Sequence, residues 1–137
     1  MRMVFINAAL VALGVAVVFP RQSKGNGSSN IEHGKYLAEN VAMCIQCHTP
    51  RDEEGNLLLD QKFHGAPIPF TSPFPNSQWA NTAPRIAGLP QYSTDQAVRL
   101  FTTGISRTGA PLRSPMPPFR MSEADARDII AYLQSLQ

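Results

Sequence analysis

The first feature of the chain is an apolar run near its beginning. Residues 3–19 contain one strongly polar side chain, Asn7, and arginines stand on either side of the run at positions 2 and 21. As a helix rising about 1.5 Å per residue, the run would be roughly 25 Å long, slightly less than a hydrocarbon core of about 30 Å. It offers no good cleavage site of small residues. The pattern therefore favours a retained transmembrane signal-anchor at residues 1–20 over a signal peptide that is removed.

A polar stretch rich in glycine and serine follows at residues 21–30. Such a composition predicts a flexible linker, and its short length would keep the next domain close to the membrane surface. The remaining residues, 31–137, are sufficient for one compact domain. The chain is thus expected to consist of an anchor, a linker and a single globular domain.

Helical patterns dominate this domain. Three segments begin with a serine that is followed three residues later by Glu, Gln or Asp, which is typical of a helix N-terminus. These serines are Ser29, Ser93 and Ser122. They predict helices over about 30–43, 94–103 and 123–136, and Gly104 would end the second.

The apolar positions within these segments agree with helices. In the first, Leu37, Val41 and Cys44 fall at i, i+4 and i+7 and would share one face. Between the helices lie two stretches, 49–91 and 105–120, that hold most of the twelve prolines and cannot keep a regular element for long. No stretch alternates as a strand would. The sequence therefore predicts an all-α, loop-rich fold with one additional N-terminal transmembrane helix.

Composition narrows the possible functions only slightly. Hydrophobic residues make up 43% of the 137 residues and charged residues 16%, which is ordinary for a globular protein. The formal charge of +2 is too small to suggest a nucleic acid as partner.

The chemistry is concentrated in the pentapeptide CIQCH, residues 44–48, which contains both cysteines of the chain. Two cysteines at this spacing occur in structural zinc sites, in dithiol redox switches and in covalent haem attachment. Zinc would need further ligands, and no second cysteine pair exists. A redox dithiol would be expected at the start of a helix in a β/α setting. Haem attachment needs only two thiols and a neighbouring imidazole that can reach the iron, and the export-type N-terminus agrees with it.

Three separated segments extend this interpretation to a family. They read GKYLAENVAMCIQCHTP, APRIAGLP and SPMPPFRMSEADARDIIAYLQSL. Together, over about residues 31–137, they resemble a class I cytochrome c, a small all-α electron carrier. The resemblance implies one covalently bound haem c with its iron and no enzymatic turnover. The sequence departs from compact members in a long insert between His48 and Pro84.

The resemblance also implies a role for individual residues. Cys44 and Cys47 would form the thioethers, and His48 would be the proximal iron ligand. The carbonyl of Pro84 would accept a hydrogen bond from His48 Nδ1–H. Met116, held between prolines, would be the sixth ligand.

Other residues compete for these roles or accompany them. Met121 is the alternative to Met116, and His64 is the alternative that would give two histidine ligands. Trp79 is expected to pack in its loop, with a hydrogen bond to a haem propionate as a second possibility. Gly34 and Tyr132 resemble the pair at which the first and last helices cross.

The expected setting is a respiratory or photosynthetic chain. The domain would lie on the periplasmic face of a bacterial cytoplasmic membrane, because haem is attached to such proteins outside the cytoplasm. Its partner would be a membrane-bound redox complex, and neither nucleic acid nor a small-molecule substrate is expected. Two alternatives are a fixed haem subunit of a larger membrane complex and a haem enzyme or sensor with an open sixth site.

Charge is unevenly distributed along the domain. Acidic residues outnumber basic ones in residues 31–60, whereas arginines outnumber acids in residues 85–120. One interpretation is that these charges simply form a solvated surface. The other is that arginines such as Arg107 and Arg113 steer an acidic partner.

Overall fold

The structure is a computed structural model of the chain and describes residues 29–75 and 78–136. The transmembrane anchor predicted at residues 1–20 and most of the linker predicted at 21–30 lie outside this part. Among the helices that the structure describes, none has the length and apolar character needed to cross a membrane.

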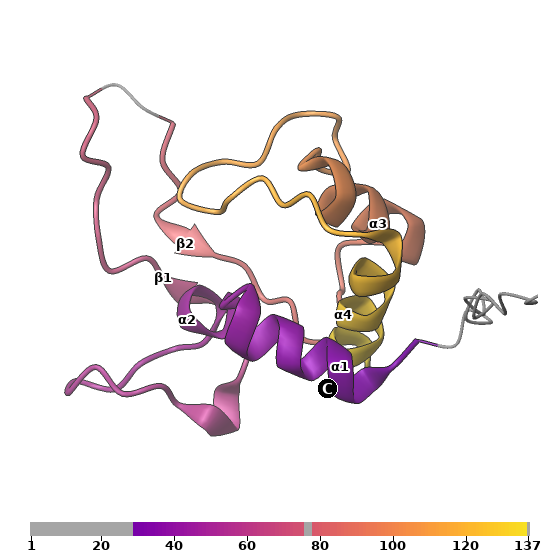
Figure 1. The fold of residues 1–137 in the computed structure, drawn as a ribbon. Helices are drawn as coiled ribbons and strands as arrows, with labels where there is room; N and C mark the ends of the chain where they lie inside the picture. The colour runs from indigo at the N-terminus through magenta and orange to yellow at the C-terminus, as the bar shows by residue number, and fades with distance from the viewer. Residues whose placement is uncertain (1–28, 76–77, 137) are drawn as a thin grey trace, which may run out of the picture.

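The described domain consists mainly of helices and loops, as the sequence predicts (Figure 1). In chain order its helical elements are α1 (Ile31–Tyr36), the π-helix η1 (Leu37–Val41), α2 (Cys44–His48), the 3₁₀-helix η2 (Leu59–Gln61), α3 (Thr94–Thr103) and α4 (Glu123–Ser135). One short antiparallel pair, β1 (Ala66–Pro67) with β2 (Thr82–Ala83), was not predicted. Two residues per strand are too few to leave an alternating pattern in the sequence.

The first helix differs from its prediction at its start. Its N-cap is Asn30, whose side chain accepts a hydrogen bond from the His33 amide at 3.1 Å. The capping box predicted at Ser29 is therefore wrong by one residue. Asparagine is as good an N-cap as serine, so the local pattern could not separate the two positions.

A π-turn changes which residues of this helix face the core. The amide of Ala42 donates to the carbonyl of Leu37 at 2.7 Å, five residues back. The extra residue in the turn rotates the segment, so that Ala38 is fully buried and Val41 is 55% exposed. The apolar face predicted from Leu37, Val41 and Cys44 is therefore wrong at Val41.

The other two predicted helices form as expected. Ser93 makes a complete capping box with Gln96, and α3 ends at Gly104, whose φ of 71° is left-handed. Ser122 caps α4 by accepting from the Asp125 amide at 3.1 Å. Local side-chain hydrogen bonds at helix ends depend on few residues, which is why sequence alone located them.

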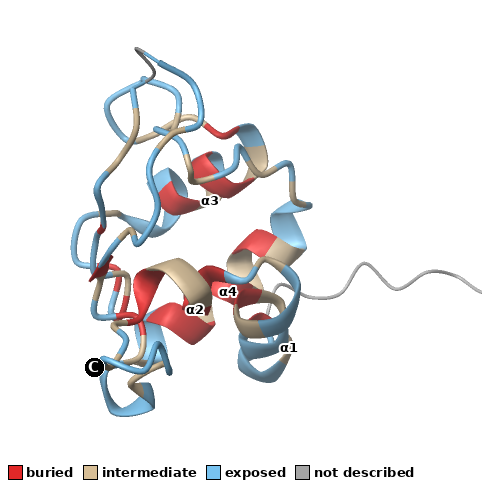
Figure 2. Cartoon of the chain, turned by 90° about the vertical axis from the view of Figure 1, so that its left-hand side faces the viewer, coloured by how far each residue is buried: buried red, intermediate tan, exposed pale blue. Residues whose placement is uncertain are grey.

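The core lies where α1 crosses α4 and where α3 packs on α4. Buried residues gather on the facing sides of these helices and on α2 (Figure 2). Gly34 permits the crossing, because a Cβ added there would lie 1.9 Å from the carbonyl oxygen of Asp128. Gly34 thus approaches the backbone of α4 and not an aromatic side chain. Tyr132, the expected aromatic partner, lies one turn further along and meets Phe63 edge to face at 6.0 Å.

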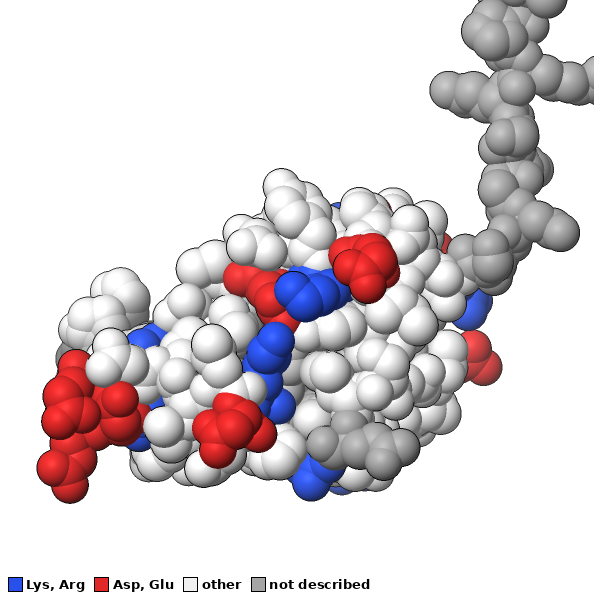
Figure 3. Space-filling model, turned by 90° about the horizontal axis from the view of Figure 1, so that it is seen from below, with Lys and Arg blue, Asp and Glu red and all other residues white. Residues whose placement is uncertain are grey.

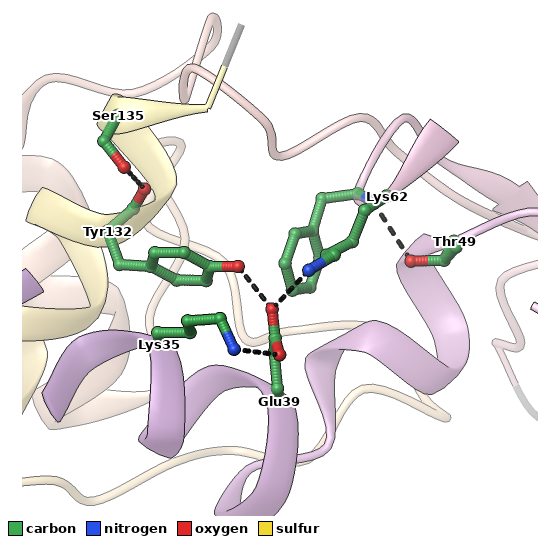
Figure 4. A network of polar contacts seen from close by, with 7 residues as sticks. Lys35, Glu39, Thr49, Lys62, Tyr132 and Ser135 are labelled. Carbon is green, nitrogen blue, oxygen red and sulfur yellow. Dashed lines mark hydrogen bonds and ion pairs between the residues drawn. The ribbon is translucent and has the colours of Figure 1, made fainter. Parts of the chain in front are cut away.

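A polar network around Glu39 connects η1 to α4 and to the loop after η2 (Figure 4). Glu39 accepts from Lys62 at 2.7 Å, from Lys35 at 3.0 Å and from the hydroxyl of Tyr132. Burial alone would raise the pKa of Glu39, but these hydrogen bonds, led by that from Lys62, lower it to about 2. Glu39 therefore stays ionised at neutral pH.

Charged side chains are unevenly distributed on the lower face of the domain (Figure 3). Seen from below, basic side chains form a band across the middle with acidic ones beside it, and a further group of acidic side chains lies at one end (Figure 3). That end is the loop projecting at the lower left of Figure 1. The loop carries Asp52, Glu53 and Glu54, the middle of the acidic stretch noted in the sequence.

Candidate haem site

A cavity of about 440 Å³ opens between α2, α3 and the loop that leads to α4. This volume lies within the range of roughly 300–1,000 Å³ that small-molecule and cofactor sites occupy. Residues of CIQCH and Met116 line it together. Its apolar lining includes Ile68, Ile86, Leu89, Leu100 and Phe101.

The CIQCH pentapeptide forms α2, a helix of its own rather than the end of the first helix. Met43 precedes it in the left-handed conformation, with φ 55°, and separates the two helices. Helical spacing places Cys44, Cys47 and His48 on one side of this short helix, because residues three and four apart are neighbours. All three line the cavity.

The two cysteines do not form a disulfide bond with each other, and Cys44 is buried. Burial raises the pKa of the Cys44 thiol to about 11, so this sulfur is protonated at neutral pH. A dithiol redox site instead depends on a thiol whose pKa is lowered. In the described part of the chain, no three His, Cys, Asp or Glu side chains are grouped as a metal ion would need. The geometry of the described residues thus supports neither a structural zinc site nor a dithiol redox switch at CIQCH.

The imidazole of His48 is held in one orientation. Its Nδ1 lies 2.7 Å from the carbonyl oxygen of Pro84, which can only accept. The hydrogen bond expected from the sequence is therefore present. Burial lowers the pKa of His48, and the Pro84 hydrogen bond opposes this in part, so the ring is neutral at pH 7. In this tautomer Nδ1 carries the proton and Nε2 keeps a lone pair, for which no described residue is a hydrogen-bond partner.

Met116 belongs to the loop between α3 and α4, at a half-buried position that lines the same cavity. In Figure 1 this loop, drawn in orange to yellow, lies across from α2. Prolines at positions 115, 117 and 118 restrict the backbone around Met116. The structure thus brings the two residues predicted as iron ligands, His48 and Met116, to one cavity. Their ligand roles remain predictions.

The competing residues lie elsewhere. Met121 packs against the core, and His64 is exposed, and neither lines the cavity. The indole of Trp79 donates to the carbonyl of Phe70 at 3.2 Å, and the two rings meet edge to face. Trp79 therefore packs within its own loop, which is the first of the two roles predicted for it.

Sequence reasoning missed the support of the His48 side of the cavity. Phe63 is fully buried with φ 61°, and its amide donates to Thr49 Oγ1 at 3.1 Å. Its carbonyl accepts from the amides of Ile86 and Ala87 at 2.9 and 3.1 Å. Phe63 thus ties the end of α2 to the segment that bears the Pro84 carbonyl. In the sequence, only Thr49, a polar residue directly after CIQCH, could have indicated this support. Nothing in the local sequence indicates that Phe63 adopts a left-handed conformation.

These residues fit the requirements of haem c. Two thiols lie one helical turn apart, an oriented imidazole has a free Nε2, and a thioether lines the same apolar cavity. The donor set is therefore the one that covalent attachment and two axial ligands need.

Comparison with known proteins agrees with this fit. No curated protein matches the chain. A family model described as Cytochrome c matches residues 31–137, a range that includes every helix and strand that the structure describes and most of the chain. The chain therefore belongs to the class I cytochrome c family, whose members bind haem c covalently and transfer electrons.

Proposed function

We propose that this protein is a monohaem electron carrier in which Cys44 and Cys47 hold haem c and His48 and Met116 are the axial ligands. One observation supports the proposal above all: His48, whose Nδ1 is hydrogen-bonded to the Pro84 carbonyl, lines the same cavity as Met116. When bound, haem c supplies an iron that gains and loses a single electron.

The side chains determine what kind of haem protein this is. The Pro84 carbonyl fixes the rotation and tautomer of His48, so that Nε2 is the atom left for iron. The Met116 thioether would be the second protein ligand of the iron and would favour the reduced state relative to a second histidine. With both positions filled, no position is left for a substrate. The arrangement therefore supports a carrier rather than an enzyme or a gas sensor.

The setting is part of the same proposal. The domain is tethered by residues 1–20 to the outer face of a bacterial cytoplasmic membrane, and it exchanges electrons with a membrane-bound redox complex. Support comes from the apolar run at residues 3–19 and from the need to attach haem outside the cytoplasm. Expression of the full chain, followed by separation of membranes from soluble protein, tests the tether. Haem-stained protein in the soluble fraction would overturn it.

The ligand assignment is tested on the holoprotein by comparing two methionine variants. The oxidised protein is expected to show the weak far-red absorption band of a thioether bound to ferric iron. Met116→Ala should lose this band and allow the reduced protein to bind carbon monoxide. Met121→Ala, a matched change outside the cavity, should retain the band. The opposite pattern would assign the ligand to Met121, and a wild type without the band would favour the open-site enzyme or sensor.

A further inference from the structure

A two-stranded ribbon runs from the His48 side of the cavity toward Met116. We define the ribbon as residues 66–70 and 79–83. Its strands pair through β1 and β2, and the amide of Ile68 donates to the carbonyl of Asn81 at 2.9 Å. Next to its base stands Pro84, whose carbonyl accepts from His48. The ribbon belongs to the long insert that distinguishes this sequence from compact members of the family.

The outer end of the ribbon contacts the loop that bears Met116. The amide of Ala80 donates to the carbonyl of Ser114 at 2.7 Å, which gives a parallel bridge between Trp79 and Ser114. The guanidinium of Arg113 donates through Nη2 to the carbonyl of Trp79 at 3.1 Å. Ser114 and Arg113 stand two and three residues before Met116.

These two contacts are notable because no other hydrogen bond reaches the described residues 113–120 from outside that segment. The flanking residues are anchored separately, since the amides of Leu112 and Met121 donate to Gly104 and Phe101. Within residues 113–120, the amide of Met116 bonds to Arg113, and Arg120 bonds to Pro118 and Phe119, all inside the segment. Among the described residues, only the Ala80–Ser114 and Arg113–Trp79 hydrogen bonds join this segment to the rest of the domain. Its prolines stiffen the segment, but stiffness alone does not attach it.

We propose that Arg113 and the ribbon form a clamp that holds Met116 in its place at the cavity. The proposal rests on the proposed function, in which Met116 is an iron ligand. Arg113 is then a positioning residue, acting on Met116 through the backbone of Ser114 and Pro115. The ribbon also reaches Pro84, so one element positions both axial ligands.

A competing ligand measures the strength of the clamp. Imidazole added to the oxidised holoprotein binds iron only in molecules from which Met116 has departed, so its apparent affinity scales with the fraction that is open. Arg113→Met removes the guanidinium but keeps an unbranched side chain. It is expected to raise imidazole affinity about five- to tenfold, the factor that corresponds to one lost hydrogen bond. Arg113→Lys retains a donor and should lie between the two.

The matched control is Arg107→Met, in the same loop. Arg107 is exposed and makes no hydrogen bond to another described residue, so its loss removes the same charge without touching the clamp. Its imidazole affinity should equal that of the wild type. A second variant, Ala80→Pro, deletes the amide that donates to Ser114 and should raise imidazole affinity without changing any charge.

Hydrogen exchange of the holoprotein gives an independent readout. In Arg113→Met, peptides covering 112–120 and the ribbon should exchange faster, whereas peptides from α1 should not change. Equal imidazole affinity and equal exchange in Arg113→Met, Arg107→Met and wild type, with the far-red band present, would overturn the clamp alone. A wild type without the band would overturn both the clamp and the assignment of Met116.

Discussion

The Nδ1 atom of His48 lies 2.7 Å from the carbonyl oxygen of Pro84. The contact joins the end of α2 to the residue that follows β2, and it determines which ring nitrogen is free. Because Pro84 can only accept, Nδ1 carries the proton, and Nε2 keeps the lone pair that a metal requires. A residue far along the chain thus determines which imidazole atom is available for coordination.

Replacement of His48 by alanine should abolish the low-spin state of the haem protein. Cys44 and Cys47 remain available in this variant, so covalent attachment can still occur, but the proximal ligand is missing. Absorption spectra of oxidised and reduced holoprotein report the change. His64→Ala is the matched control, because His64 is exposed and does not line the cavity. A loss of the low-spin spectrum in His64→Ala, with His48→Ala unaffected, would reverse the assignment.

The features that could be predicted from the sequence are those in which few neighbouring residues decide the outcome. The capping box at Ser93, the stop at Gly104 and the spacing within CIQCH are of this kind. The partnership of His48 with Pro84 came from family resemblance, since 36 residues separate the two.

What could not be predicted depends on contacts between distant segments. The π-turn in η1 places Ala38 in the core and Glu39 beside Lys62, and neither consequence can be read from helical periodicity. The left-handed Phe63 is maintained by its contacts with Thr49, Ile86 and Ala87. The ribbon has strands too short to show a pattern. In each case tertiary packing overrides a local preference.

Glu39 should make the stability of the protein depend on pH in the acidic range. Its pKa is lowered from 4.5 to about 2 by hydrogen bonds from Lys62, Tyr132 and Lys35, against the opposing effect of burial. A carboxylate with a lowered folded-state pKa stabilises fully above its unfolded value, and the contribution is lost as pH falls toward 2. Glu39→Gln should therefore lower the free energy of unfolding at pH 7 by roughly 1–3 kcal/mol.

Urea denaturation of both proteins at a series of pH values measures this difference. The two free energies of unfolding should converge as the pH falls from about 4.5 to about 2, because both side chains are then uncharged. Glu54→Gln, at an exposed turn of the acidic loop, should leave the free energy unchanged within about 0.5 kcal/mol. A constant gap between wild type and Glu39→Gln over the whole range would contradict the role of the charge.

Gly34→Ala should destabilise the domain although alanine is the better helix former. Propensity alone would stabilise α1 by about 1 kcal/mol. The added Cβ, however, would lie 1.9 Å from the carbonyl oxygen of Asp128, which is backbone and cannot rotate away. Helices α1 and α4 would have to separate, at a net cost of about 2–3 kcal/mol. Thermal unfolding of the holoprotein measures this cost, and Tyr36→Ala, at an exposed position of the same helix, is the control. A melting temperature for Gly34→Ala equal to or above that of the wild type would show that the crossing can relax.

Arg107→Glu should slow electron transfer to an anionic oxidant. Among the described residues, no carboxylate forms an ion pair with the arginines at positions 99, 107, 113 and 120, so their charge is available to a partner. Arg107 is the best single site, because Arg113 also bonds to Trp79 and its replacement would disturb the loop. Stopped-flow oxidation of the reduced holoprotein by ferricyanide should be slower in Arg107→Glu at low ionic strength by about two- to fivefold. The difference should vanish at high salt, where the charges are screened.

Arg127→Glu makes the same charge change on α4, where Arg127 pairs with Glu123, and should have a smaller effect. Equal rates and equal salt dependence in both variants would mean that only the net charge matters and that the 85–120 region does not steer the partner.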